Sequence, residues 1–309
     1  MPKIEYAIIV RAKTRLEQLK ARYNTAAQAK FVVERSGGNF SDYEAEQNRL
    51  DQAVSQVQRE LSQVVKSKVV EREFLPSFIF ADDQVVVVVG QDGLVANAAK
   101  YVRGRPLVAV NPDPARYDGV LLPFRPDTCR AAVHTLVRGG EVPLRTQPLA
   151  QATLQDGQRL LAFNDLFIGA ASHVSARYRL TFGEATEEQS SSGILVATPA
   201  GSTGWLSSVF NMARGLEAFT RQPQLPAMPT PAPGELLFVV REPFLSQRTQ
   251  AGLVAGRLAA GRPLQVESLM PAGGVIFSDG VESDFLRFIS GSVATVGPSG
   301  EVARLVQAG

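Results

Sequence analysis

An aspartate on a glycine-flanked turn is the residue of this chain best placed to carry chemistry. The five valines Val85–Val89 lead into the turn Gly90-Gln91-Asp92-Gly93, and residues 94–101 have the pattern of a helix. Such a β-branched run is typical of a parallel strand buried on both faces, and ligands of open α/β sheets bind beyond the carboxyl ends of their strands. Glycines let a phosphate approach the backbone, and the first amides of a helix can hold it. The alternative is a tight turn in which Asp92 only caps the helix.

A second polar stretch, Asn164-Asp165, stands at the end of a predicted strand. A carboxylate can accept hydrogen bonds from both hydroxyls of a ribose, and an amide can both donate and accept. Asn and Asp are also common turn residues, so a plain turn is the alternative.

A third stretch runs from Thr198 to Trp205 and is rich in glycine and small hydroxyl residues, between a predicted strand and a predicted helix. Backbone amides and hydroxyls in such a run can surround an anion or a flat ring. Trp205, the only tryptophan, can stack on a base or can serve only in packing. Further on, Asp279-Gly280 either completes a pocket or simply closes a hairpin.

The elements that position these motifs are predicted to form two domains. In the first, strands alternate with helices, which indicates a parallel sheet with helices on its faces. We therefore predict a Rossmann-like α/β domain over residues 1–125, which carries the Gly-Gln-Asp-Gly turn. Its predicted strands are 4–10, 69–74, 84–89, 107–111 and 119–122, and its helices are a stretch from Leu16 that ends at Gly37-Gly38 and a longer helix capped by Ser41.

Residues 126–309 have the pattern of an antiparallel β-rich domain, in which short alternating strands are separated by turn residues. Predicted strands include 144–147, 159–164, 175–181, 193–198, 235–240 and 263–268, with helices at 129–138 and 207–219. The segment Gln222–Gly234 contains five prolines, so we expect a connecting loop, with a lid as the alternative.

Composition excludes several classes of protein. The 309 residues are 45% hydrophobic and carry a formal charge of only +2, so the overall balance requires neither a nucleic acid nor a membrane as partner. The single cysteine, Cys129, rules out an intrachain disulfide, and we expect it to serve in packing. The amino terminus lacks the pattern of a signal peptide, and the default expectation is a cytoplasmic protein.

Charge is unevenly distributed near the start of the chain. Residues 1–35 hold eight basic and three acidic side chains, whereas residues 36–60 hold five acidic and two basic ones. Opposite charges could pair the two helices, but a solvated face is the favoured interpretation because exposed ion pairs contribute little.

Together, the motifs resemble those of the NAD kinase family, over most of the chain and in the same order. The family's Gly-Gly-Asp-Gly-Thr motif is matched by Gly90 to Leu94, its Asn-Glu pair by Asn164-Asp165, and its Thr-Pro-Thr-Gly-Ser-Thr-Ala-Tyr run by Thr198 to Trp205. The resemblance implies transfer of a phosphate from ATP or polyphosphate, with Mg²⁺, to the 2′-hydroxyl of the adenosine ribose of NAD.

The resemblance also implies roles for individual residues. Asp92 would be the general base that takes the proton of the 2′-hydroxyl, and Gly90, Gln91 and Gly93 would form the phosphate turn. The NAD-binding residues would be Gly93, Asn164, Asp165, Thr203, Gly204, Trp205 and Ser208. No metal site formed by protein side chains is expected. Members of the family usually form dimers or tetramers, so the resemblance also implies a homo-oligomer.

Several positions depart from the family's pattern, among them Asp165, which is one methylene shorter than the family's Glu. Gln91 replaces a glycine, Leu94 replaces a threonine whose hydroxyl can bind phosphate, and Ser192 replaces an acid. These departures keep two alternatives open. One is a related lipid or sugar kinase, because such kinases share the Gly-X-Asp-Gly turn. The other is a protein that binds NAD(H) without catalysis, although the retention of Asp92 argues against it.

Overall fold

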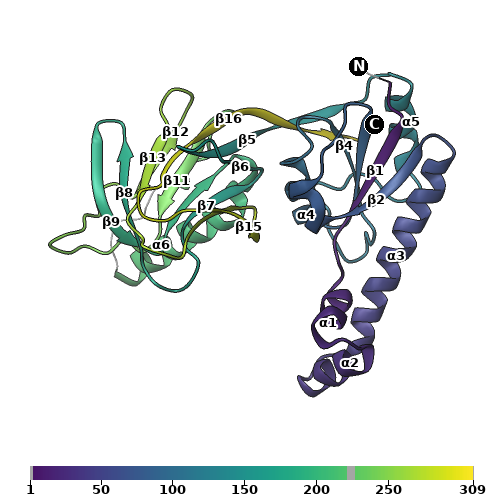
Figure 1. The fold of residues 1–309 in the computed structure, drawn as a ribbon, viewed down its shortest axis with the longest axis horizontal. Coiled ribbons are helices and arrows are strands. Elements are labelled where there is room, and N and C mark those ends of the chain that lie inside the picture. Colours follow the sequence, from purple (N-terminus) through teal and green to yellow (C-terminus); the bar gives the residue numbers. More distant parts are fainter. Residues whose placement is uncertain (1–2, 221–226, 309) are drawn as a thin grey trace. The chain divides into compact units, whose positions relative to one another are not determined.

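The computed structural model describes residues 3–220 and 227–308, and its chain divides into two compact units (Figure 1). The first unit comprises Met1–Thr146 and Ala303–Gly309, and the second comprises Gln147–Val302. Two long strands, β5 (Leu144–Leu154) and β16 (Val293–Val306), each contain the point where the chain passes from one unit to the other. The sequence-based boundary at residue 125 would have left helix α5 (Cys129–Val137) and the last residues of the chain outside the first unit.

The first unit is built on a parallel sheet in the strand order β2-β1-β3-β4, joined at its edge by the last residues of β16, which also run parallel to β4. Its strands are β1 (Tyr6–Arg11), β2 (Lys66–Glu71), β3 (Gln84–Val89) and β4 (Pro106–Val110). The chain leaves β1 to one side for β2 and then crosses to its other side for β3. The carboxyl ends of β1 and β3 therefore mark a topological switch point, where ligands of such sheets bind.

The valine strand lies at the centre of the core of this unit, as its composition predicts. Val85, Val87 and Val89 face α3 (Phe40–Ser62) and α5, whose Val57 and Val133 are fully buried in the same cluster. The intervening valines are also fully buried. Helix α4 (Asp92–Ala99) is separated from the end of β3 by only two residues, Gly90 and Gln91, and contacts β3.

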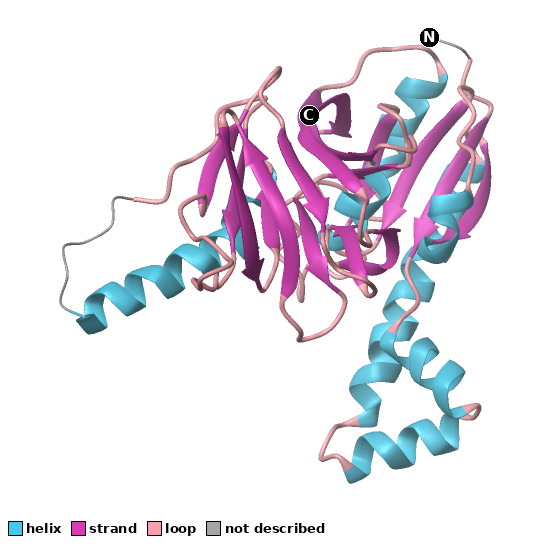
Figure 2. Ribbon diagram, turned by 60° about the vertical axis from the view of Figure 1, so that its left-hand side comes forward, coloured by secondary structure: helices cyan, strands magenta, loops and turns pink. Residues whose placement is uncertain are grey.

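A helical arm stands between β1 and β2, formed by α1 (Arg15–Tyr23), α2 (Ala26–Arg35) and the first half of α3 (Figure 2). The sequence predicted one helix where α1 and α2 lie. The chain breaks there because Asn24 adopts a left-handed conformation with φ of 64° and the side chain of Thr25 caps α2 by accepting from the amide of Gln28. The cap of α3 is Asn39 rather than the predicted Ser41.

Two further predictions for this unit change. Residues 119–122 form no strand but a turn within the loop after β4. The predicted strand 69–74 ends at Glu71 and continues as a short 3₁₀ helix, η1 (Arg72–Ser77). Both stretches have β-branched or aromatic residues, but neither has a neighbouring strand to pair with.

The second unit packs two antiparallel layers face to face, which confirms the expected α/β plus antiparallel β class. One layer has the strand order β12-β11-β10-β7-β14-β15, and the other contains β16-β13-β8-β9 together with β5 and β6. Their bounds are β6 (Arg159–Ala162), β7 (Asp165–Ala170), β8 (Ala176–Phe182), β9 (Ala185–Ser191), β10 (Ile194–Ala197), β11 (Leu236–Val240), β12 (Ala255–Leu258), β13 (Leu264–Ser268), β14 (Gly274–Ser278) and β15 (Val281–Arg287).

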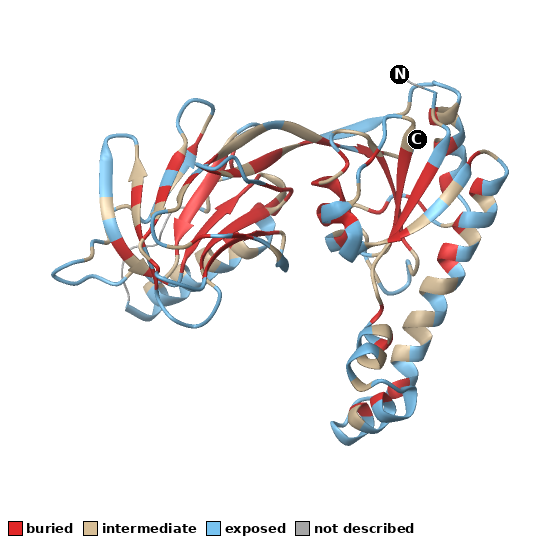
Figure 3. Ribbon diagram, viewed as in Figure 1, coloured by how far each residue is buried: buried red, intermediate tan, exposed pale blue. Residues whose placement is uncertain are grey.

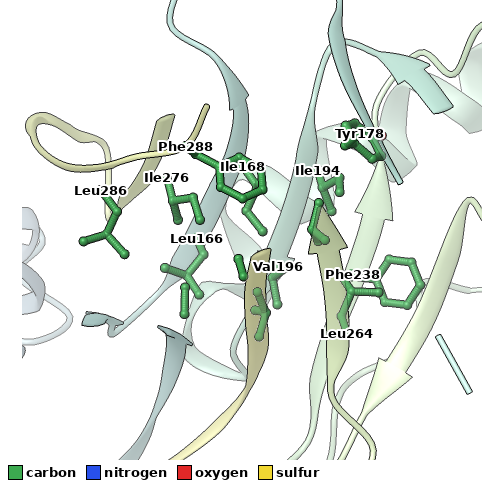
Figure 4. Packing of buried hydrophobic residues seen from close by; sticks show 14 of the residues in the cluster. Leu166, Ile168, Tyr178, Ile194, Val196, Phe238, Leu264, Ile276, Leu286 and Phe288 are labelled. Carbon is green, nitrogen blue, oxygen red and sulfur yellow. The ribbon is translucent and has the colours of Figure 1, made fainter. Parts of the chain in front are cut away.

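Alternating side chains of the two layers form the core of this unit (Figure 4). Ile168, Ile194, Phe238 and Leu264 are fully buried there. The outer face of the first layer carries η2 (Ala200–Thr203) and α6 (Trp205–Thr220), whose Leu206 packs on β10 and β11 residues. Figure 3 shows that burial is concentrated in the strands of each unit, while much of the helical arm is exposed.

The proline-rich segment 222–234 falls partly outside the described residues, which resume at position 227. Residues 227–234 have no helix or strand, as predicted. In the described ranges, none of the helices combines the length and apolar character needed to cross a membrane.

Candidate functional site

The turn after β3 holds Asp92 at the first position of α4, at the carboxyl edge of the parallel sheet. Its Oδ1 accepts a hydrogen bond of 2.8 Å from the backbone amide of Leu121, so one oxygen ties α4 to the loop after β4. The other oxygen accepts no hydrogen bond within the described residues. Asp92 is therefore more than a helix cap: it is a carboxylate held by one oxygen with the second available for chemistry.

The residues around Asp92 show why this turn tolerates departures from an all-glycine pattern. Gln91 has φ of −99° and ψ of 167°, an extended conformation that any residue adopts. Leu94 is buried and covers Gly90, where an added Cβ would lie 2.8 Å from the leucine Cδ2. A Cβ at Gly93 would meet nothing within 4 Å, so the amides of Asp92 and Gly93, which have no intrahelical acceptor, remain open to an anion.

Next to this turn lies a cavity of about 550 Å³, enclosed by residues of the first unit at the carboxyl ends of β1, β2, β3 and β4. Gly90, Gln91, Gly93 and Leu94 line it, while Asp92 does not. Its charged lining is mainly basic and consists of Lys13, Arg15, Arg49, Arg72 and Arg116, with the acids Glu46 and Asp113. None of the sequence motifs contains these cations, although the excess of basic residues before position 36 is a signal for the first two.

The charges of the arm pair rather than merely facing water. Glu46 on α3 accepts from both Nε (2.8 Å) and Nη2 (2.5 Å) of Arg15 on α1, and Arg49 donates to Asp113 at 2.7 Å. The Arg15–Glu46 pair thus joins α1 to α3, as the pairing alternative predicted, while about half of the Arg15 side chain stays exposed. Their pairing fixes the guanidinium groups at the wall of the cavity.

In the second unit, Asp279 brings two of the predicted motifs together. Its carboxylate accepts backbone hydrogen bonds from Phe163 (3.1 Å), Asn164 (2.7 Å) and Asp165 (3.3 Å). Asp279 and Gly280 have φ of 52° and 70° and form the two-residue turn between β14 and β15, which suits an Asp-Gly pair. The turn is thus both a hairpin and an anchor for the Asn-Asp pair.

The Thr198 to Trp205 run is joined to the same place. The Thr198 hydroxyl donates to the carbonyl of Phe163 at 2.6 Å, and the Thr198 amide donates to the carbonyl of Asn164 at 2.8 Å. Gly201 packs so closely that a Cβ would lie 2.2 Å from the Asn164 carbonyl oxygen. Three segments far apart in sequence therefore meet at one end of the sheet, with Asp165 buried and Asn164 half-buried.

The remaining predicted residues lie on the rim of this cluster. Thr203, Gly204 and Ser208 are exposed, at the end of η2 and the start of α6. Trp205 stacks on Phe167 with ring centroids 5.6 Å apart and an interplanar angle of 8°.

A second cavity of about 510 Å³ lies beside Trp205 on the second unit, and Trp205, Phe277, Ser192 and His173 are among its lining residues. Arg241 lies 5.2 Å from the Trp205 ring centroid. An aromatic wall with a nearby cation suits a flat ring. The residues Asn164, Asp165, Thr203, Gly204 and Ser208 do not line this cavity.

The described residues include no group of three or more His, Cys, Asp or Glu side chains that could hold a metal ion. Cys129 is buried, and its burial raises the pKa of the thiol to about 11, so it stays protonated at neutral pH. Arg179 of β8 pairs with Glu267 and Glu188 of adjacent strands.

Comparisons with known proteins confirm the resemblance to NAD kinases. A curated NAD kinase of Chlorobaculum tepidum is 32% identical over 125 residues, and one of Methylococcus capsulatus is 30% identical over 131 residues. Each alignment covers 40% of this chain and 43% or 44% of the relative, so the chain spans less than half the length of these relatives. No family model matches the chain.

A solved structure described as an NAD kinase from Archaeoglobus fulgidus in complex with ATP matches 98% of this chain and 94% of its own. The TM-score is 0.55 at 14% sequence identity, which shows a shared fold over both units.

Proposed function

We propose that this chain is a kinase that phosphorylates the 2′-hydroxyl of the adenosine ribose of NAD to give NADP. The observation that carries the proposal is the geometry of Asp92, a carboxylate fixed through Oδ1 with its second oxygen available. Its position beside a basic cavity at the switch point of a parallel sheet supports the same proposal. The partial similarity to two curated NAD kinases identifies the chemistry to test first.

In the proposed reaction, the 2′-oxygen attacks the terminal phosphorus of the donor, and the bond from that phosphorus to the bridging oxygen breaks. Asp92 takes the proton of the hydroxyl, and the shortened donor, ADP if the donor is ATP, leaves with the bridging oxygen. Such transfers depend mainly on positioning and on neutralising charge. The amides of Asp92 and Gly93 would supply part of that neutralisation.

We assign the NAD-binding role to the cluster of the second unit. Asn164 and Asp165 would bind the ribose, in a backbone held by Asp279. Thr203, Gly204 and Ser208 would line the adenosine site, and Trp205 would offer a flat face for stacking. A homo-oligomer remains an expectation of this proposal, and light scattering on the purified chain would test it.

Magnesium would be carried by the donor. Mg²⁺ is usually bound through one or two carboxylates together with substrate phosphates, and the described residues gather no set of three metal-ligating side chains. When bound, the ion would neutralise charge on the phosphate oxygens.

The direct test is to incubate the purified chain with NAD, Mg²⁺ and either ATP or polyphosphate, and to detect NADP with a dehydrogenase that accepts only NADP. Asp92→Asn should lower turnover by roughly two to four orders of magnitude, as expected for loss of a general base. An asparagine keeps Oδ1, so the hydrogen bond from Leu121 survives and folding should be unaffected. Asp127→Asn, at an exposed aspartate, is the matched control.

The absence of NADP with both donors, relative to a protein-free blank, would exclude the NAD kinase and leave the two alternatives, a related lipid or sugar kinase and a protein that binds NAD(H) without catalysis. If NADP forms but Asp92→Asn has normal turnover, the base lies elsewhere.

A further inference from the structure

The basic cavity beside Asp92 contains more than the predicted phosphate turn explains. The Gly90–Leu94 segment forms only one wall. Three other walls come from the segment 12–15 after β1, from α3 of the helical arm, and from the loop after β4, with Arg72 at the start of η1. The arm therefore contributes directly to a site at the switch point of the sheet.

The charges on these walls leave a net positive site. Five cationic side chains line the cavity and only two carboxylates, Glu46 and Asp113, do. Both carboxylate side chains are more buried than their partners: 16% of Glu46 and 13% of Asp113 is exposed, against 48% of Arg15 and 51% of Arg49. The acids thus hold the guanidinium groups from the protein side.

Hydrogen-bonding capacity remains on these groups. A guanidinium has five N–H donors, and Arg49 uses one nitrogen, Nη1, on Asp113. The Nη2 of Arg116 is 4.0 Å from Oε2 of Glu46, which is too far for a hydrogen bond. Arg72 is exposed and forms no salt bridge within 4.0 Å in the part of the chain that the structure describes, although the pKa of the neighbouring Glu73 is lowered by the hydrogen bond from Lys13 and, to a smaller extent, by the charge of Arg72. Arginine in such a setting favours bidentate contacts with phosphate.

We propose that Arg49, Arg72 and Arg116 bind the phosphoanhydride chain of the donor, and that the helical arm is a donor-binding element. This proposal rests on the proposed function, because a polyanion bound in the cavity is a phosphate donor only if the chain is a kinase. It also accounts for Leu94, because a turn that offers no hydroxyl to phosphate is compensated by Arg49 of the arm together with Arg72 and Arg116 from outside it. A cavity of about 550 Å³ is in the range of small-molecule sites.

Two donors share this chemistry, a nucleoside triphosphate and inorganic polyphosphate. The test measures binding of ATP and of inorganic tripolyphosphate to the full chain, separately and without NAD, by isothermal titration calorimetry. Arg72→Gln and Arg49→Gln should each weaken the bound polyanion roughly tenfold, and the double variant more, because each loses a charge-assisted contact. The matched control is Arg35→Gln, at the end of α2 on the same arm but outside the cavity, which should change affinity less than about twofold.

The ratio of the wild-type affinities for ATP and for tripolyphosphate shows which of the two donors the cavity recognises. ATP binding at least tenfold tighter than tripolyphosphate supports a nucleotide donor, and equal binding supports recognition of the phosphate chain alone. The proposal is overturned if neither polyanion binds, if the cavity variants bind like wild type, or if Arg35→Gln weakens binding as much as they do. Circular dichroism of each variant would verify that it is folded.

These outcomes are independent of NADP formation. Arginine-dependent binding without NADP would refute the proposed function and leave the polyanion site standing. If Arg72→Gln and Arg49→Gln form NADP with an unchanged KM for the donor, the proposed function stands and the arginine site is refuted.

Discussion

Asp279 offers the sharpest test of how the second unit is held together, because one carboxylate accepts three backbone hydrogen bonds at 2.7 to 3.3 Å. Its φ of 52° is left-handed, so a substitution can change both the hydrogen bonds and the backbone strain. Glycine at this position removes the carboxylate and tolerates the conformation. Alanine removes the carboxylate and is strained, and asparagine keeps one oxygen and tolerates the conformation.

The expected losses of unfolding free energy follow from this comparison. Leaving a buried amide without its acceptor costs about 1–3 kcal/mol, and the three are not additive, so Asp279→Gly should lose about 3 kcal/mol. Asp279→Ala should lose about 0.5–1 kcal/mol more, since left-handed strain exceeds the entropic cost of glycine. Asp279→Asn should lose only about 1–2 kcal/mol, because its oxygen can still accept from Asn164 and Asp165.

The assay is urea unfolding followed by the fluorescence of Trp205, the only tryptophan, which lies in the same unit as Asp279. Its signal therefore reports the unit that carries the substitution. Asp156→Gly is the control, because Asp156 is an exposed turn aspartate of this unit whose carboxylate bonds only Gln158. A value for Asp279→Gly within about 0.5 kcal/mol of wild type, the usual range of surface substitutions, would refute the anchoring role.

Two other substitutions test separate features. Gly201→Ala should destabilise the protein by about 3 kcal/mol or more, because its Cβ would lie 2.2 Å from the Asn164 carbonyl oxygen. The control is Gly215→Ala inside α6, where a Cβ meets nothing within 4 Å. That substitution should stabilise the helix by about 0.5–1 kcal/mol. Equal effects in thermal unfolding would contradict the close approach. Burial raises the pKa of Cys129 from 9.0 to about 11. The unfolded chain therefore loses the thiol proton at a lower pH than the folded chain does. The free energy of unfolding is unaffected below pH 9 and falls by about 2–3 kcal/mol as the pH rises from 9 through 11. Unfolding from pH 8 to 11.5 should show this extra loss in wild type and not in Cys129→Ala.

Much of the fold could be predicted because local patterns and tertiary packing agree. The strand 84–89 and the helix starting at Cys129 have the predicted limits within one residue, since an unbroken valine run and a regular apolar spacing each fit only one element. Predictions were less accurate where a single residue breaks a pattern. Asn24 divides one predicted helix into two through its left-handed backbone, a conformation that the spacing of apolar residues does not reveal.

Long-range pairing could not be predicted from local patterns. Strand β16 contains Pro298, Ser299 and Gly300, residues typical of a turn, yet it continues and brings Arg304 and Leu305 beside β4 in the first unit. Residues 119–122 have the composition of a strand and form a turn whose amide binds Asp92 instead. In both cases the partner is distant in sequence, and the partner decides the structure.

The same distinction applies to the candidate site. Motifs identified Asp92, Asn164 and Asp165, because chemistry requires particular residue types at short spacing. The cations of the cavity come instead from four separate segments that only the sheet topology brings together, and no short motif contains them. The departures at Gln91 and Leu94 acquire a physical meaning in this setting. Gln91 causes no backbone strain, because its extended conformation is open to any residue. Leu94, in contrast, lacks the hydroxyl that could bind a phosphate, and only groups outside the motif can replace that contact. A difference in donor handling should therefore follow Arg49, Arg72 and Arg116 rather than the residues of the turn.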